Sequence, residues 1–343
     1  MLLSSAKKVS VYRSTTANPF VNLAVESFLF NNPKDPDEYS LYLWRNGPSV
    51  IIGKFQSAWR ECEVQKMEDE KVNLVRRPSG GGAVYQDLGN SIFTFLSPKS
   101  DKNSIDANNG ILLDALKSYG IDAVATGRND LHVDGRKVSG AAFRNTRDRS
   151  LHHGTILLNL DMTALSRYLT PNKVKLQSKG VSSVEAHVLN LQTRVPTITH
   201  EGIGEALVNS FFKAHGSTCA VEDIDTDAIL KAEPHVRQVA AQLEDWDWRF
   251  GSKEPSFTHQ IETSRLSWGT FDVNMVVKKG TIESVAIYCD ALDIPLLEGI
   301  RIALTGVEYS PTSVRSALES VPIVGASNPE HLKEFSDWIV NKL

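Results

Sequence analysis

The segment Arg76–Asn90, which reads RRPSGGGAVYQDLGN, constrains this chain more than any other. Three consecutive glycines give a core no side chains and have the most backbone freedom to lose on folding. Two arginines precede them, and a short apolar run follows. Glycine amides can approach an anion closely, and arginine supplies charge and forked donors. The pattern therefore favours a loop that binds a phosphate-bearing ligand, with a plain turn between strands as the alternative.

Neither common nucleotide-binding fingerprint fits this loop. No Gly-Lys-Ser/Thr follows the glycines, so it is not a P-loop, and Tyr85 stands where a dinucleotide fingerprint needs Gly or Ala. A nucleophilic enzyme is also not indicated. The sequence has no Gly-x-Ser-x-Gly elbow, and Cys62 lies between two glutamates that disfavour a reactive thiolate.

Composition sets the broad class. With 343 residues, 41% of them hydrophobic and 23% charged, the chain is typical of a globular protein of about two domains. The net charge of -4 argues against a surface that coats nucleic acid. Three widely separated cysteines form no zinc or disulfide pattern, which favours a reducing, intracellular compartment. No apolar run approaches the length of a membrane span.

Local patterns predict alternating strands and helices. The start is basic up to Glu26, as in transit peptides, but Val9–Tyr12 already predicts a strand, so we interpret it as a native or processed terminus. Asn18-Pro19 predicts a helix start. The other main predictions are a strand at 91–96, helices at 59–71, 104–119 and 200–214, a hairpin spanning 271–287, and a last helix after Asn328-Pro329.

A second motif surrounds Lys137. Asp134-Gly135 between two strand-like runs predicts a tight hairpin. Simple alternation places Lys137, Ser139 and Ala141 on one face of the returning strand, and Val138 and Gly140 on the other. Small neighbours leave room for a ligand beside the Lys137 ammonium, which suits the neutralisation of a phosphate. An isolated lysine is usually only solvent-facing, so the motif around it carries the hypothesis.

His152-His153 is a weaker candidate. Adjacent residues on a strand point to opposite faces, and no cysteine or carboxylate cluster lies nearby in sequence. The sequence therefore predicts no dedicated metal site.

Taken together, these segments resemble the lipoate–protein ligase family in order along nearly the whole chain. The matching stretches are NLAVE (22–26), LWRN (43–46), VIIG (50–53), RRxSGGGAV (76–84), DLGN (87–90), GRNDL (127–131), RKVSG (136–140), HHGT (152–155), KGVSSV (179–184) and WxWxFG (246–251).

The resemblance implies a fold and a reaction. The fold is α/β (α+β): a biotin/lipoate ligase-type catalytic domain, residues 1–250, and a small C-terminal accessory domain, residues 251–343. The reaction consumes lipoate and ATP, with Mg²⁺, to give lipoyl-AMP. The lipoyl group then passes to a lysine of lipoyl domains in 2-oxoacid dehydrogenase E2 subunits and the glycine-cleavage H protein. Neither nucleic acid nor membrane is an implied partner. The implied location is the cytoplasm in a bacterium or the mitochondrion in a eukaryote.

The resemblance also implies site residues. Lys137 matches the catalytic lysine that contacts both the ATP phosphate and the lipoyl carbonyl. The matching ATP and lipoyl-AMP positions are Arg77, Ser79, Gly80, Gly81, Gly82, Ala83, Val84, Tyr85, Asn90, Asp130, Lys137, His153 and Thr155. A loop that closes over the adenylate matches Lys179, Gly180, Val181, Ser182 and Ser183.

Some positions depart from the family pattern. Pro78 and Gln86 stand where serine and histidine are common, and the hairpin at Asp134-Gly135 is shorter than in some relatives. These departures concern fine substrate preference. The main alternative is a lipoyl or octanoyl transferase that takes its group from lipoyl-AMP or an acyl carrier without ATP. Biotin ligation and a non-catalytic adenylate sensor are weaker alternatives.

Overall fold

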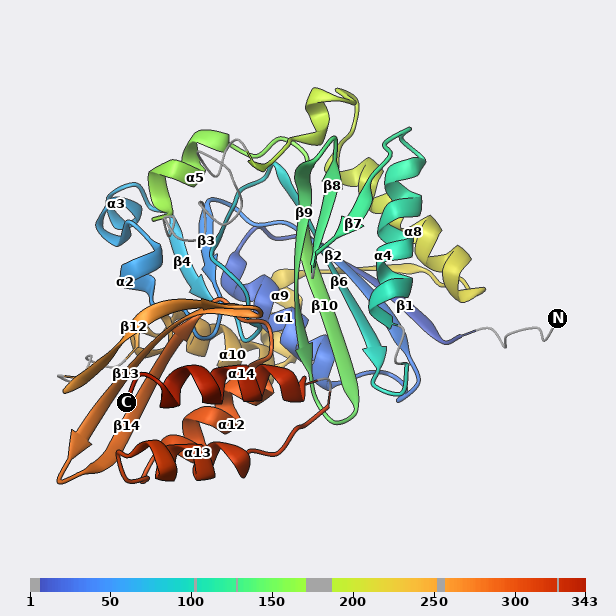
Figure 1. The fold of residues 1–343 in the computed structure, drawn as a ribbon. Helices are drawn as coiled ribbons and strands as arrows, with labels where there is room; N and C mark the ends of the chain where they lie inside the picture. Colours follow the sequence, from blue (N-terminus) through green and yellow to red (C-terminus); the bar gives the residue numbers. More distant parts are fainter. Residues whose placement is uncertain (1–6, 102–103, 128, 171–186, 252–256, 326) are drawn as a thin grey trace. The chain divides into compact units, whose positions relative to one another are not determined.

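The computed structural model describes residues 7–101, 104–127, 129–170, 187–251, 257–325 and 327–343 (Figure 1). The chain divides into two compact units, each built from several stretches of sequence. The first comprises residues 1–51, 62–75 and 84–245, and the second comprises 52–61, 76–83 and 246–343. No helix in the described ranges is long and apolar enough to cross a membrane.

An eight-stranded sheet forms the centre of the first unit, in the order β11-β1-β2-β6-β10-β9-β8-β7. β1 pairs in parallel with β2 and β11, and the other neighbours are antiparallel. The strands are β1 (Val9–Ser14), β2 (Tyr39–Trp44), β6 (Asn90–Pro98), β7 (Val124–Thr126), β8 (Asp130–Val133), β9 (Arg136–Asn145), β10 (Arg149–Leu157) and β11 (Val221–Ile224). This confirms the expected mixed α/β class.

A small sheet, β4-β3-β5, carries the chain into the glycine loop and out of it. It consists of β3 (Ser49–Ile52), β4 (Asn73–Arg76) and β5 (Val84–Gln86). The helices of the first unit are α1 (Pro19–Asn31), α3 (Val64–Asp69), α4 (Ser104–Lys117), α5 (Met162–Tyr168), η1 (Leu191–Thr193), α8 (His200–His215), α9 (Thr226–Ala232) and α10 (Pro234–Glu244).

The two faces of the large sheet have different roles. One face packs against α4 and α8, where Phe93 and Phe95 of β6 join the apolar cluster that includes Leu112 and Leu207 (Figure 1). Thr94, between those phenylalanines, points the other way and donates to Glu26 of α1. The face beside α1 therefore holds polar side chains, and the candidate site is built there.

One predicted helix is wrong in its extent. Instead of a single helix at 59–71, the structure has α2 (Ala58–Glu61) and α3, with a break between them. At the break, Cys62 forms a β-bridge with Leu169, and the Glu63 N–H donates to the Tyr168 carbonyl at 2.9 Å. These pairings with a distant segment replace the helical bonds that local sequence favours.

The second unit contains an antiparallel sheet, β12-β13-β14, with its own core. Its elements are α2, α11 (Trp246–Phe250), β12 (His259–Leu266), β13 (Gly269–Lys278), β14 (Thr281–Cys289), α12 (Ile294–Leu304), α13 (Pro311–Glu319) and α14 (Pro329–Val340). The predicted hairpin is confirmed, with positive φ at Lys279 and Gly280. The last helix begins, as predicted, after the Asn328 cap.

Candidate active site

The hairpin that carries Lys137 forms as predicted but contains a bulge. Asp134 and Gly135 have φ values of 50° and 72°, the left-handed geometry of a tight two-residue turn. The pairing then shifts, because Leu131 lies opposite Ser139 whereas His132 lies opposite Lys137. One extra residue, Val138, is thereby inserted, and its side chain is fully buried in the core.

This bulge corrects the predicted faces of β9. Lys137 lies on the same face as Gly140, rather than with Ser139 and Ala141. Its side chain runs so close over Gly140 that a β-carbon there would lie 2.4 Å from Lys137 Nζ. The physical reason is that the extra residue of a bulge shifts the following side chains to the other face of the strand. A prediction from strict alternation does not include this shift.

Lys137 forms an ion pair with Asp130 on the neighbouring strand. The distance from Lys137 Nζ to Asp130 Oδ1 is 2.7 Å, and the two side chains are 23% and 16% exposed. Asp130 lies opposite Gly140 in the β8–β9 register, so the pair spans the glycine. The arrangement holds an ammonium at a fixed point beside a strand surface of small residues.

His153 and Thr155 lie on this same face of the sheet. Thr155 pairs with Gly140, and His153 pairs with Ala142. His153 Nδ1 lies 2.8 Å from Glu26 Oε1, which also accepts from Thr94 Oγ1 at 2.6 Å. Glu26 is 1% exposed, so the buried carboxylate fixes the orientation of the imidazole.

His152 points to the opposite face, as predicted for adjacent strand residues. Its ring contacts Phe143, Phe93 and Phe95, with centroid distances of 4.7, 5.5 and 6.0 Å. Burial lowers the pKa of His152 to about 3, with the neighbouring His153 as a smaller cause. His152 is thus a neutral core residue.

The glycine loop belongs to the second unit, where the Arg77 side chain shapes it. Arg77 is 6% exposed. Its Nε donates to Ser79 Oγ and to the Gly80 carbonyl, both at 3.1 Å, and its Nη2 donates to the carbonyls of Gly80 and Gly82 at 2.6 and 2.9 Å. The guanidinium therefore places a positive charge inside the curve of the loop.

Close backbone packing explains the first two glycines. A β-carbon on Gly80 would lie 2.3 Å from the Ala291 carbonyl oxygen, and the Gly81 N–H donates to that same oxygen at 3.1 Å. Gly81 has a φ of 90°, a backbone angle that residues with a side chain rarely adopt. The Gly81 amide is thus used within the protein, in contrast to the prediction that the glycine amides turn toward an anion.

Arg76, the other arginine of the motif, is structural. It is 8% exposed. Its guanidinium donates to the carbonyls of Trp248 and Arg249, both at 2.8 Å, and to those of Gly53 and Lys54 at 3.2 and 3.0 Å. The sequence predicted that both arginines face a ligand. Arg76 instead binds backbone carbonyls, two of them more than 170 residues away, which local sequence does not reveal.

The residues after the loop return to the first unit. Tyr85 is buried and stacks on Tyr168, with ring centroids 5.6 Å apart, and burial raises its pKa. Asn90 is fully buried, and its Oδ1 has no hydrogen-bond partner among the described residues. Val84 begins β5, and Ala83 precedes it. The predicted loop Lys179–Ser183, and Arg128 of the GRNDL stretch (127–131), lie outside the described residues.

Sequence reasoning missed three side chains that contact other residues of the candidate site. Glu26 holds His153, and its only signal was its place in the NLAVE stretch. His132 and His187, with Asp130, form a group whose potential metal-ligand atoms lie within 4.8 Å of one another. Neither histidine is part of a recognisable metal motif in sequence, because a bulge and a distant segment bring them together.

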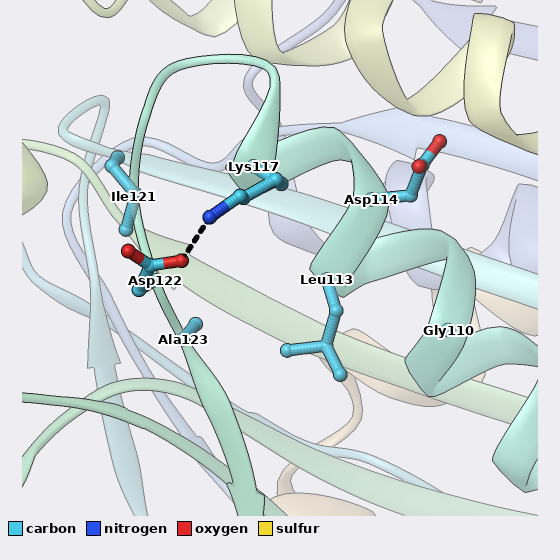
Figure 2. Close-up of a pocket in the computed structure, with 7 residues that line it drawn as sticks. All are labelled: Gly110, Leu113, Asp114, Lys117, Ile121, Asp122 and Ala123. Atoms are coloured by element: carbon cyan, nitrogen blue, oxygen red, sulfur yellow. Dashed lines mark hydrogen bonds and ion pairs between the residues drawn. The ribbon is translucent and has the colours of Figure 1, made fainter.

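A shallow depression elsewhere in the first unit contains none of the predicted site residues (Figure 2). It lies against α4 and the chain that follows it, and the Lys117–Asp122 ion pair crosses it. Its lining residues are Gly110, Leu113, Asp114, Lys117, Ile121, Asp122 and Ala123. We assign it no role in the chemistry.

Comparison with known proteins covers nearly the whole chain. Residues 18–212 match the lipoyl protein ligase A/B catalytic domain, and residues 254–339 match the bacterial lipoate protein ligase C-terminus. The chain belongs to the lipoate–protein ligase family. Lipoate-protein ligase A of Psychrobacter cryohalolentis is 41% identical, and that of Bdellovibrio bacteriovorus 42%, each over 98% of this chain and 99% of the relative.

Solved structures of lipoate–protein ligases share the fold. P. falciparum LipL1 in complex with lipoate matches with a TM-score of 0.86 at 34% identity, over 97% of this chain and 99% of that one. A lipoate-protein ligase A bound with ATP matches with a TM-score of 0.62 at 25% identity, over 71% and 99% of the two chains. A bi-partite ligase from Thermoplasma acidophilum, described with its E2 lipoyl domain, matches with a TM-score of 0.63 at 25% identity, over 73% and 99%.

Family membership gives the enzyme class. This lipoate–protein ligase activates lipoate and transfers it to protein. The alternative of a transferase that needs no ATP is not favoured, because the full-length relatives are ligases and a ligase neighbour was solved with ATP.

Proposed function

We propose that this chain converts lipoate and ATP to lipoyl-AMP and pyrophosphate at Lys137, and then passes the lipoyl group to a lysine of a lipoyl domain. The observation that carries the proposal is the Lys137 ammonium, held 2.7 Å from Asp130 across Gly140. A cation fixed in this way can meet developing negative charge without reorganisation.

The first step joins two anions. The lipoate carboxylate attacks the α-phosphorus of ATP, an oxygen–phosphorus bond forms, and the bond to pyrophosphate breaks. Positive charge must screen the approach and stabilise the transition state. We assign this role to Lys137, with Asp130 as the residue that positions it. Arg77 supplies a second positive charge in the glycine loop, which we propose as an ATP-binding segment with Ser79, Gly80, Gly81, Gly82 and Ala83.

Mg²⁺ enters this scheme as part of the MgATP substrate. The described residues offer one cluster of potential metal ligands, and only Asp130 in it is an oxygen donor. Mg²⁺ prefers carboxylate, phosphate and water oxygens, so a cluster with two imidazoles does not fit it, and we propose that the ATP phosphates carry the Mg²⁺.

The second step transfers the acyl group. The acceptor amine attacks the lipoyl carbonyl carbon, the new carbon–nitrogen bond forms, the amine loses a proton, and AMP leaves with the bonding electrons. Lysine has an ordinary pKa of about 10.4, so the acceptor must be neutral when it attacks. A nearby ammonium lowers the pKa of an approaching amine, and Lys137 can do so while it polarises the carbonyl.

The remaining assignments follow from the same proposal. His153 and Thr155 line the face next to Gly140, and Val84, Tyr85 and Asn90 flank the nucleotide. The resemblance implies adenylate contacts for residues 179–183, which lie outside the described residues. The catalytic and accessory domains correspond to residues 1–250 and 251–343. The protein substrates are lipoyl domains of E2 subunits and the H protein, supported by the archaeal relative described with its E2 lipoyl domain. We place the reaction inside the cell, in the cytoplasm or in the mitochondrion.

Lipoate-dependent release of pyrophosphate from MgATP, without acceptor protein, tests the activation step. We expect release from the wild-type chain and a loss of about hundredfold or more in Lys137→Ala. Lys117→Ala, which removes an exposed ion pair from α4, is the matched control and should retain full activity. A wild-type chain that transfers from synthetic lipoyl-AMP but releases no pyrophosphate would identify a transferase. Near-normal turnover in Lys137→Ala would refute the role of Lys137.

A further inference from the structure

Two histidines lie beside the Lys137–Asp130 pair and take no part in the reaction above. His132 follows Asp130 on the same face of β8 and pairs with Lys137 across the hairpin. His187 is held nearby because Val188 forms a β-bridge with Lys137, and the Leu189 N–H donates to the Lys137 carbonyl at 2.8 Å. The two imidazole rings lie edge to face with centroids 5.7 Å apart.

One carboxylate and two imidazoles form a ligand set suited to a transition metal. The potential ligand atoms of Asp130, His132 and His187 all lie within 4.8 Å of one another. Zinc bonds of about 2.0–2.2 Å with tetrahedral geometry separate ligand atoms by ~3.4 Å, so small side-chain rotations would close the group on an ion. Three protein ligands leave a fourth position for water.

A neighbouring hydroxyl supports the same arrangement. His132 Nδ1 is hydrogen-bonded to Thr126 Oγ1 on β7. With the hydroxyl oxygen accepting from Nδ1–H, Nε2 is the ring nitrogen that would ligate the metal. Metal-binding histidines are commonly oriented by a hydrogen bond to the other ring nitrogen. His132 therefore has an outer partner as well as a place in the ligand group.

We propose that Asp130, His132 and His187 bind a divalent transition metal ion of the Zn²⁺ type, which inhibits lipoate activation by taking Asp130 from Lys137. The ligand set selects against Mg²⁺, because imidazole suits zinc and its neighbours in the series whereas Mg²⁺ prefers oxygen. Metal binding itself is independent of the proposed function, and only the inhibition rests on it.

Competition follows from a shared carboxylate. Asp130 Oδ1 lies 2.7 Å from Lys137 Nζ, so an ion bound to this carboxylate brings a double positive charge beside the ammonium. Like charges at this separation repel strongly where solvent screening is incomplete. Lys137 would lose its anchor and leave its position over Gly140. The bound metal ion would thus displace the Lys137 ammonium, on which the activation step depends.

Metal binding can be measured without lipoate or ATP. The full chain, free of any affinity tag, is titrated with Zn²⁺ against a chromophoric chelator, and with Co²⁺ as a visible-absorption probe of coordination. We expect one ion per chain. The double variant His132→Gln/His187→Gln should bind at least tenfold more weakly. His235→Gln, an exposed histidine on α10, is the matched control and should bind as the wild type does.

The outcomes of the titration decide the site. One ion per chain, weakened in the double variant and not in the control, supports it. Absence of stoichiometric binding, or equal affinity in the double variant, overturns it. Circular dichroism checks that the double variant is folded. If it is not, the single variant His187→Gln is judged by the same criterion.

A second measurement tests inhibition. Pyrophosphate release is followed at saturating MgATP under buffered Zn²⁺, and each variant is compared with its own rate without Zn²⁺. We expect the half-inhibiting Zn²⁺ concentration to rise at least tenfold in the double variant. Binding without inhibition overturns the competition with Lys137. A wild-type chain without any lipoate-dependent turnover refutes the proposed function, whereas the titration still decides the metal site.

Discussion

At the residue scale, Gly140 controls where Lys137 can lie. A β-carbon there would come within 2.4 Å of Lys137 Nζ and 2.5 Å of Cε, and 3.5 Å from Asp130 Oδ1. The closest atoms belong to the end of a flexible side chain, which can move at small cost. The absence of a side chain at residue 140 therefore matters more for the position of the Lys137 ammonium than for the stability of the strand.

Gly140→Ala should separate these two effects. We expect lipoate-dependent pyrophosphate release to fall at least tenfold, because Lys137 is pushed from its place, while the free energy of unfolding changes by less than about 1 kcal/mol. Gly110→Ala is the matched control. Its β-carbon would meet open space on α4, so stability should rise by roughly 0.5–1 kcal/mol with unchanged activity. Normal turnover in Gly140→Ala would show that the position of Lys137 over this residue is unimportant.

Much at this scale could be predicted from sequence, but not all of it. Small residues around Lys137 pointed to that residue, and the family resemblance implied Asp130 as a site residue. Glu26 did not, since its contact with His153 joins residues 127 positions apart. His132 and His187 escaped notice for the same reason, because a β-bridge outside the named strands brings their segments together.

At the scale of elements, turns were predictable and irregularities were not. Asp134-Gly135 and Lys279-Gly280 both have left-handed geometry, which glycine favours and aspartate tolerates, and the glycine in each pair was the signal for the turn. The bulge at Val138 was missed because its cause is burial of an apolar side chain in a core assembled from distant segments. The break at Cys62 has a similar cause, since Leu169 and Tyr168 supply its pairing.

The close packing of the glycine loop against residues 291–292 predicts that a substitution in the loop destabilises the fold. Gly80→Ala puts a β-carbon 2.3 Å from the Ala291 carbonyl oxygen and 2.9 Å from Leu292 Cα, and backbone atoms cannot move aside cheaply. We expect the free energy of unfolding to fall by about 2–3 kcal/mol, with loss of activity. Urea unfolding of this variant and of Gly110→Ala provides the measurement. An unchanged midpoint would mean that the loop does not pack closely on this segment.

At the scale of the whole molecule, buried histidines make the fold sensitive to acid. Burial lowers the pKa of His152 to about 3, and it is the main cause that lowers the pKa values of His200 and His215 to about 4. Each is neutral when folded, whereas the unfolded chain takes up protons below an ordinary pKa of about 6.5. Their stabilising effect is therefore complete above pH 6.5 and is lost as the pH falls toward 3–4.

His152→Phe should reduce this acid sensitivity. Between pH 6 and pH 4 the free energy of unfolding of the wild type should include a loss of about 1.4 kcal/mol per pH unit from this one group, and the variant should lack it. Phenylalanine suits a site already formed by Phe93, Phe95 and Phe143. Urea unfolding over this pH range gives both slopes, with exposed His235→Phe as control. Equal slopes in wild type and His152→Phe would show that His152 is not held neutral.

The composition of the second unit has a consequence for synthesis of the chain. The Arg76 guanidinium donates a hydrogen bond to the carbonyl of Trp248, which lies 172 residues further along the chain. Ala291, whose carbonyl accepts a hydrogen bond from the Gly81 N–H, is synthesised later still. At roughly 5–20 residues per second, a ribosome reaches these partners about 10–40 s after it has made the loop. Until then the loop lacks the bonds from Arg76 to Trp248 and from Gly81 to Ala291, so a nascent chain halted before residue 246 should leave it accessible to protease.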